Sequence, residues 1–131
     1  MRLLADTSAW VEYLRGTGSP TSQSLKQHLA GDALLTTDVV VMEVLAGARD
    51  DAHEARLAAV LSLATPVPVE RVDWTDAARL QRRCRAQGET VRRLPDCLIA
   101  AVAIRAEVAV LHRDKDFDAL ARHTALRARS G

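Results

Sequence analysis

One stretch decides the fold of this chain: Leu3-Leu4-Ala5-Asp6-Thr7-Ser8. An apolar run that is too short for a helix ends on a carboxylate, and a segment with helical periodicity follows at once. We interpret Leu3–Asp6 as a buried strand and either Thr7 or Ser8 as the cap of the next helix. Ligands of open parallel sheets bind beyond the carboxyl ends of the strands, so Asp6 is a candidate site residue.

Strands and helices alternate along the rest of the chain. The run Val39–Ala48 is ambiguous, because its β-branched residues favour a strand, whereas its length, Gly47 and a possible cap at Asp38 favour the helix that we predict. A later helix is expected to begin at Asp73 or Thr75 and to end near Gln87. Further strands are predicted at Ala33–Thr37, Pro66–Val69, Val108–Leu111 and Ala125–Ala128. This pattern predicts one α/β domain over residues 1–131, with helices on both faces of a mostly parallel sheet.

Composition sets the class of protein. The chain has 131 residues, of which 48% are hydrophobic, as in a soluble globular domain. No segment approaches the roughly 20 uninterrupted apolar residues of a membrane span, and Asp6 and Glu12 interrupt any signal peptide. We therefore expect a cytoplasmic protein with no membrane partner. Cys84 and Cys97 have no metal-like spacing and are expected to be small buried hydrophobes.

The net charge of +1 conceals an asymmetry between the two halves. Residues 1–77 carry a balance of −5, whereas residues 78–131 carry a balance of +6. Most of the basic residues are arginine, whose planar guanidinium suits bidentate contacts to phosphate. The pattern is compatible with nucleic-acid binding, and a solvated basic helix face is the alternative.

A few carboxylates stand out from the solvated majority, in which we place Asp50, Asp51, Glu54, Asp73 and Asp76. Asp6 ends an apolar strand, Glu43 interrupts an apolar run, and Asp96 precedes a helix that is apolar from Cys97 to Ile104. Burying such charges is costly unless they are paired or bind a metal. Each has an ordinary alternative, respectively a helix cap, an arginine partner and the helix dipole.

Asp114 and Asp116 follow the predicted strand Val108–Leu111 and join this group. A set of oxygen ligands without histidine or cysteine suits Mg²⁺ or Mn²⁺. Such ions promote phosphoryl chemistry by activating a water and by stabilising the leaving oxygen.

The motifs together identify a resemblance to a known family. The chain resembles the PIN-domain ribonucleases and, among them, the VapC toxins of type II toxin–antitoxin systems. The matching stretches are Leu4–Trp10, Val40–Gly47, Pro95–Ala101 and Leu111–Phe117. The resemblance implies a three-layer α/β/α fold around a roughly five-stranded parallel sheet.

The same resemblance implies a site and its roles. Asp6 and Asp96 are expected to be direct metal ligands, whereas Glu43 and Asp114 complete the site or hold a water. Asp116 is a possible fifth catalytic member, and Ser8 matches a hydroxyl that supports the first aspartate. Many members have threonine where this chain has His112-Arg113, so the role of His112 stays open. The residues expected to hold the RNA backbone are Arg92, Arg93 and Arg113.

The implied function is that of a Mg²⁺-dependent endoribonuclease toxin. Its implied partners are RNA, a second copy of the chain in a homodimer, and a VapB-like antitoxin. That antitoxin would be a small DNA-binding protein with an inhibitory C-terminal segment. One alternative is a phosphotransferase or phosphatase with Asp6 as nucleophile. Such sites typically have a second aspartate at the position of Ser8, and a lysine near the last strand that Lys115 matches only loosely. The other is a non-catalytic RNA-binding or antitoxin-docking module, against which the retention of all four acids argues.

Overall fold

Five strands form one all-parallel sheet, in the order β3-β2-β1-β4-β5. The computed structural model describes all residues from 1 to 131. The strands are β1 (Leu3–Ala5), β2 (Leu34–Thr36), β3 (Thr65–Pro66), β4 (Ala109–Leu111) and β5 (Ala128–Arg129). The sheet confirms the predicted α/β class and the parallel arrangement of the strands.

Seven helices connect and cover these strands. They are α1 (Thr7–Leu14), α2 (Pro20–Ala30), α3 (Asp38–Ala46), α4 (Asp51–Leu61), α5 (Arg71–Ala86), α6 (Leu94–Arg105) and α7 (Lys115–His123). The ambiguous run of β-branched residues is the helix α3, as predicted. None of the helices is long and apolar enough to cross a membrane.

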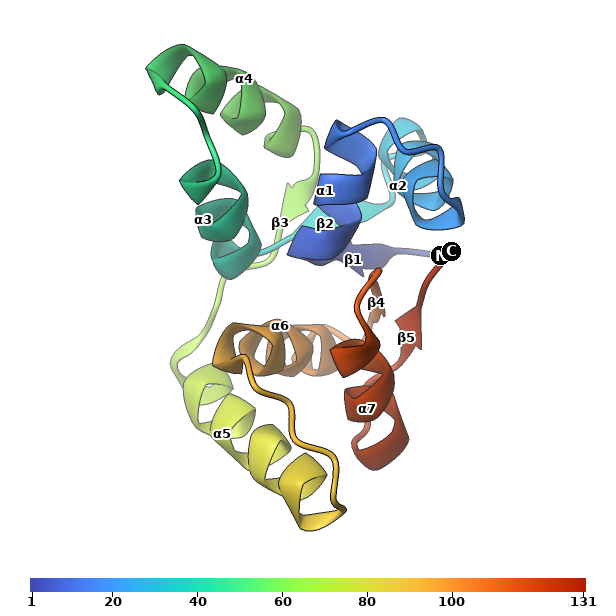
Figure 1. Ribbon diagram of the computed structural model, residues 1–131, viewed down its shortest axis with the longest axis vertical. Coiled ribbons are helices and arrows are strands. Elements are labelled where there is room, and N and C mark those ends of the chain that lie inside the picture. Colours follow the sequence, from blue (N-terminus) through green and yellow to red (C-terminus); the bar gives the residue numbers. More distant parts are fainter.

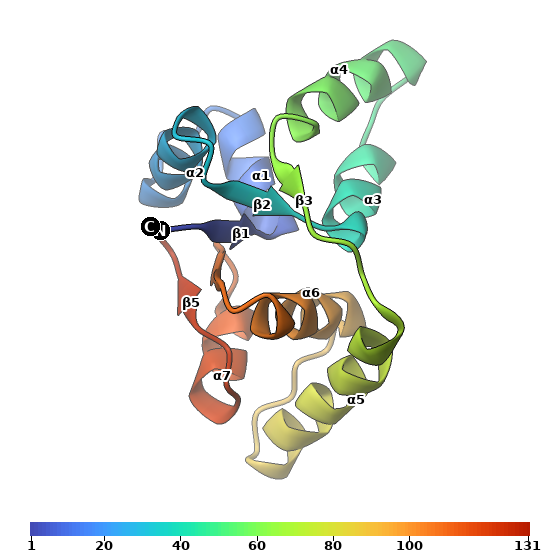
Figure 2. The ribbon, with the colours of Figure 1, turned by 180° about the vertical axis from the view of Figure 1, so that it is seen from behind.

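The order of the strands divides the helices into two layers. The chain runs from central β1 outward to β2 and β3, then returns to β4 and β5 on the other side. Because parallel crossovers are right-handed, reversing the direction of travel moves the connecting helices to the opposite face. In Figure 1, α1 to α4 accordingly lie in the upper half and α5 to α7 in the lower half. Figure 2 shows the same division from behind, with the two chain ends adjacent.

The core is built on both faces of β1. All three of its residues are fully buried, and Leu4 pairs with Leu35 on one side and with Val110 on the other. Trp10 from α1 and Phe117 from α7 are the largest fully buried side chains. The apolar run at the start of α6 is also buried, which confirms that this helix is enclosed nearly all round. Both cysteines are free and buried, as expected.

The structure corrects three predicted helix starts. Asp6 caps α1, and the predicted caps Thr7 and Ser8 are the first two residues of the helix. The predicted cap Asp38 is likewise the first residue of α3, after Thr37. In α5 the helix begins at Arg71, because Glu70 and Asp73 form a reciprocal capping box that adds a turn before the predicted start.

Two predicted edge strands are also displaced. β3 is limited to Thr65–Pro66 instead of Pro66–Val69, and β5 covers Ala128–Arg129 instead of Ala125–Ala128. Pro66 and Pro68 cannot donate to a ladder, which keeps β3 short and at the sheet edge. Thr124 and Leu126 form a turn through the Thr124 hydroxyl, so the chain reaches the sheet later than its apolar residues predicted.

Asp73 was expected to be solvated, and this expectation is wrong. Its side chain is fully buried and accepts hydrogen bonds from Arg105, with Nε 3.0 Å from Oδ1 and Nη2 2.9 Å from Oδ2. Asp73 shares its helix face with the buried Ala77, Leu80 and Cys84. The helical spacing of these residues already placed Asp73 on the inner face of α5.

Candidate active site

The sequence-predicted acids gather where the sheet changes direction. Asp6 follows β1, Asp114 follows β4, and these two strands are neighbours at the point where the chain reverses its course. Ligands of open α/β sheets bind at such switch points. A pocket of about 290 Å³ opens here. Its polar and charged lining consists of Asp6, Thr7, Ser8, Glu12, Arg93, Asp96, Arg113 and Asp114.

Asp6 is held in place by the first turn of α1. Its Oδ1 accepts the backbone N–H of Ala9 at 2.9 Å, and the Ser8 hydroxyl lies 2.8 Å from both carboxylate oxygens. The side chain is 2% exposed, and this burial raises the pKa of Asp6 to about 6. The hydrogen bonds from Ala9 and Ser8 oppose the rise. Asp6 is therefore a fixed carboxylate whose pKa lies closer to neutral pH than that of an ordinary aspartate.

Asp96 lies in the first turn of α6, after Pro95. The residue is 3% exposed, and its Oδ2 is buried without a hydrogen-bond partner in the protein. Burial is the main cause that raises the pKa of Asp96 to about 7. Arg93 lowers it, whereas the charges of Asp114 and Asp6 raise it further. A buried carboxylate oxygen without a partner is costly and calls for a cation or a donor from outside the chain.

Asp114 and Asp116 approach Asp96 from the start of α7. Asp114 caps that helix and accepts the backbone N–H of Asp116 at 3.0 Å. One carboxylate oxygen from each of Asp96, Asp114 and Asp116 lies within 4.8 Å of the others. Burial, then repulsion by Asp114, raises the pKa of Asp116. These three acids therefore form a compact group that could hold a divalent metal ion.

Glu43 reaches the site from α3 but does not belong to that compact group. Its Oε1 accepts the Thr7 hydroxyl at 2.8 Å, and its Oε2 pairs with the guanidinium of Arg93. Glu43 therefore has the arginine partner that was the ordinary alternative to metal binding. Because Arg93 also lines the acidic pocket, the pair connects α3 to the residues around Asp96.

The predicted RNA-binding arginines occupy different positions. Arg93 and Arg113 line the pocket, whereas Arg92 is exposed outside it and acts on Asp116 only through its charge. The backbone N–H of Arg113 donates to the Ser8 hydroxyl at 2.9 Å, and its guanidinium lies 3.8 Å from Glu12. Two guanidiniums therefore border the carboxylates.

His112 is buried beneath the site and contacts residues that position it. Its ring packs against Phe117 with centroids 5.4 Å apart, and Nδ1 accepts the backbone N–H of Asp114 at 3.2 Å. Burial lowers the pKa of His112 and keeps the ring neutral at neutral pH. A neutral ring leaves Nδ1 free to accept, so His112 helps to fix the backbone of Asp114.

The sequence argument missed two residues of the pocket wall. Thr7 was considered only as a helix cap, yet its hydroxyl holds Glu43. Glu12 was used only to exclude a signal peptide, yet it lines the pocket and pairs with Arg113. The spacing of Ser8 and Glu12 was an available signal, because residues i and i+4 share one face of a helix.

Comparison with known protein families identifies a relationship over nearly the whole chain. The family model described as PIN domain matches residues 3–123. The chain is 42% identical over 131 residues to the ribonuclease VapC11 of Mycobacterium tuberculosis, covering 98% of each sequence.

Solved structures share the fold. VapBC2 from Rickettsia felis, bound to a DNA fragment from its promoter, has a TM-score of 0.78 at 16% identity, covering 98% of each chain. VapBC-5 from Mycobacterium tuberculosis, a member of the VapBC family of toxin–antitoxin systems, has a TM-score of 0.66 at 26% identity. The alignment with VapBC-5 covers 97% of this chain and 96% of that one.

Proposed function

Because this chain belongs to the PIN-domain family, we propose that it is a metal-dependent endoribonuclease and the toxin of a toxin–antitoxin pair. One observation carries the proposal at the level of the site. Carboxylates from three separate parts of the chain, Asp6, Asp96 and Asp114, meet in one pocket at the switch point of the sheet. The 42% identity to a named VapC ribonuclease over nearly the whole sequence supports the same reaction.

The residues present fit a divalent cation. The Oδ2 atom of Asp96 is buried without a partner, and one oxygen each from Asp96, Asp114 and Asp116 converges within 4.8 Å. The donors are all carboxylate oxygens, which suits Mg²⁺ or Mn²⁺ better than a softer ion. We propose that Asp96 and Asp114 hold the ion directly, together with Asp116 or with Asp6.

The bound ion would supply the Lewis acid that makes a water nucleophilic at neutral pH and stabilises the leaving oxygen. The protein supplies position and charge. Ser8 holds both oxygens of Asp6, and Thr7 together with Arg93 holds Glu43, so the carboxylates keep their places before substrate arrives. Arg93 and Arg113 line the pocket, where their guanidiniums would hold the phosphates on either side of the scissile bond.

The phosphotransferase alternative has no comparable support. A nucleophilic aspartate needs a free oxygen aimed at the substrate. Both oxygens of Asp6 instead accept the Ser8 hydroxyl, and Oδ1 also accepts the Ala9 N–H. Asp6 is therefore better suited to support a metal site than to attack phosphorus.

We propose that the partner is an antitoxin with a basic C-terminal segment. A second pocket of about 330 Å³, lined in part by Val11, Leu14 and Val44, begins beside the acidic pocket and shares Thr7 with it. An apolar segment seated there could extend an arginine to the carboxylates and pair with them. The related VapBC structures support a partner of this kind, and we propose a homodimer on the same grounds.

The decisive experiment is cleavage of a folded RNA by purified protein with Mg²⁺, with Mn²⁺ and with excess chelator. Cleavage is expected with either metal and is expected to stop in chelator. Asp96→Asn removes the carboxylate with the unpartnered oxygen and should abolish cleavage under all three conditions. Asp50→Asn, in an exposed helix cap that asparagine can replace, is the matched control and should cleave like the parent. Full cleavage in chelator would refute the metal mechanism.

A further inference from the structure

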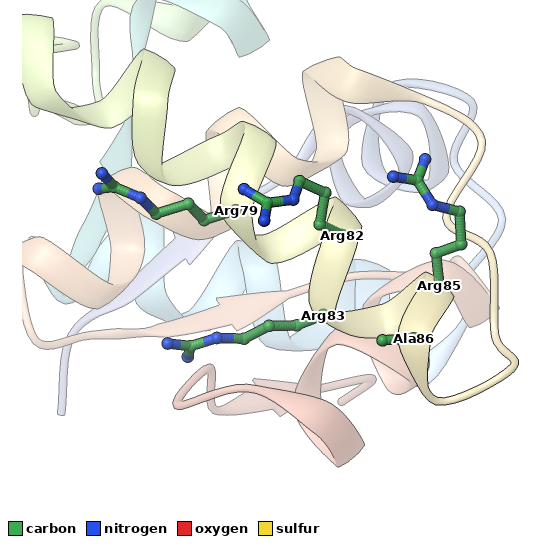
Figure 3. Close-up of a pocket in the computed structure, with 5 residues that line it drawn as sticks. All are labelled: Arg79, Arg82, Arg83, Arg85 and Ala86. Carbon is green, nitrogen blue, oxygen red and sulfur yellow. The ribbon is translucent and has the colours of Figure 1, made fainter.

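The basic excess of the second half of the chain is concentrated on one helix. The sequence of α5 places Arg79, Arg82, Arg83 and Arg85 within two helical turns. We call these four residues the arginine face. With Ala86 they line an open depression of about 560 Å³ that contains no carboxylate (Figure 3). Figure 3 shows that Arg79, Arg82 and Arg83 extend in the same direction, whereas Arg85 leaves the helix on another side.

The charges of the arginine face are largely uncompensated. Only Arg79 has an acidic partner, Asp76 at 3.2 Å, and this pair is exposed. Arg82, Arg83 and Arg85 make no ion pair and no side-chain hydrogen bond within the protein. Exposed pairs contribute little to stability, and unpaired guanidiniums contribute less. The fold therefore does not need these side chains where they are.

The arginine face is separate from the acidic pocket. Arg79 and Arg83 border a groove against Ala101 and Ile104 in the second half of α6. Asp96 lies in the first turn of that helix, five residues before Ala101 and eight before Ile104, which corresponds to about 8–12 Å along the axis. A ligand that contacts both places must extend well beyond a single phosphodiester.

We propose that the arginine face is a second binding site for the phosphate backbone of the RNA substrate, away from the cleaved bond. This inference rests on the proposed function, because it adds a contact to the same substrate. Guanidiniums that are planar and unpaired suit bidentate phosphate contacts. Their spread over about 9 Å of helix, from Arg79 to Arg85, suits a polymer with successive phosphates better than one small anion.

An acidic protein fits the same surface less well. Protein interfaces draw most of their affinity from buried aromatic or aliphatic anchors at the centre of the contact. The depression offers only Ala86 besides the four arginines. Arg82 and Arg85 lie outside the neighbouring apolar groove, so the depression itself has no site for such an anchor, whereas backbone recognition of RNA requires none.

The test compares binding of two RNAs in chelator, where no metal-dependent cleavage occurs. The probes are a long stem-loop RNA, which reaches both sites, and a trinucleotide, which cannot span them. The test variant is Arg82→Gln/Arg83→Gln/Arg85→Gln. The matched control is Arg2→Gln/Arg56→Gln/Arg71→Gln, which removes three exposed arginines whose guanidiniums have no acidic partner. Circular dichroism verifies that each variant is folded.

The test variant is expected to bind the stem-loop about 10–100-fold more weakly at about 0.1 M salt, with a log–log salt slope reduced by about 2–3. Its affinity for the trinucleotide should fall by a smaller factor than its affinity for the stem-loop, and the control should resemble the parent with both probes. Parent-like binding of the stem-loop would overturn the proposal, as would an equal loss in the control or an equal loss for the trinucleotide. Should the triple variant not fold, Arg82→Gln/Arg85→Gln replaces it, with a slope reduction of about 1–2 expected.

The readout separates this proposal from the proposed function. A parent chain that binds the stem-loop through α5 but cleaves no RNA with Mg²⁺ would refute the ribonuclease and leave the arginine face established. If the parent chain cleaves RNA with Mg²⁺ but the test variant binds the stem-loop normally, the arginine face is refuted as a binding site and the ribonuclease is supported.

Discussion

Replacing Asp96 by asparagine should stabilise the metal-free protein while it destroys the proposed activity. Asp96 is 3% exposed, and burial raises its pKa from 3.8 to about 7. A carboxyl group whose pKa is raised on folding favours the folded state when it is protonated. The contribution of protonated Asp96 to the free energy of unfolding is fully present below pH 3.8. It is lost as the pH rises through about 7. At pH 8 the parent chain therefore carries a buried charge that the asparagine variant lacks.

The size of the effect follows from the pKa. A rise from 3.8 to about 7 corresponds to about 4 kcal/mol of destabilisation once the group is ionised. The asparagine loses the attraction of Arg93 and leaves part of its amide unpaired, which costs about 1–3 kcal/mol. We therefore expect the free energy of unfolding at pH 8 to rise by about 1–3 kcal/mol in Asp96→Asn. At pH 4 the gain should vanish or change sign.

The assay is urea unfolding of parent and variant in chelator at pH 4, 6 and 8, with Asp50→Asn as the control. Asp50 is an exposed cap that accepts the His53 N–H, a role that asparagine can also fill, so its replacement should change stability little. Added Mg²⁺ should stabilise the parent, because it binds only the folded state, and should stabilise Asp96→Asn much less. A variant that is less stable at pH 8 and still cleaves RNA would refute the reasoning. The variant would then have lost roughly 0.3–1 kcal/mol of unfolding free energy, the usual contribution of a charge that interacts with the helix dipole.

Three further substitutions test other parts of the structure. Arg105→Ala leaves the fully buried Asp73 without its partner and should cost about 3 kcal/mol of unfolding free energy by urea titration. Arg79→Ala breaks only the exposed pair with Asp76 and should cost less than about 0.5 kcal/mol, so equal losses would contradict the importance of burial. Ser8→Ala removes a hydrogen bond that holds the pKa of Asp6 down, so this pKa should rise above its value of about 6 in the parent chain. The acidic limb of the pH–rate profile for RNA cleavage should therefore move to higher pH, and an unchanged limb would argue against a role for ionised Asp6.

The predictable parts of the fold depend on short-range pattern. The run Leu3–Ala5 is apolar and too short for a helix, which sufficed to predict a buried strand. The edges were less predictable, because caps depend on which neighbouring side chain reaches a free N–H. Asp6 caps α1 in place of Thr7 or Ser8 since its carboxylate lies 2.9 Å from the Ala9 N–H. Similarly, the pairing of Glu70 with Asp73 set the start of α5.

The sequence by itself determined the alternation of strands and helices, the parallel sheet and the set of carboxylates that end or interrupt apolar runs. These properties follow from periodicity and from the cost of burying charge, both of which act over a few residues. Tertiary structure alone decided which acids meet. Asp96, Asp114 and Asp116 converge within 4.8 Å, whereas Glu43 is held by Thr7 and Arg93, and Asp73 is buried against Arg105 elsewhere. Such distances depend on strand order and helix packing, which bring together residues far apart in the chain, and no local pattern encodes them.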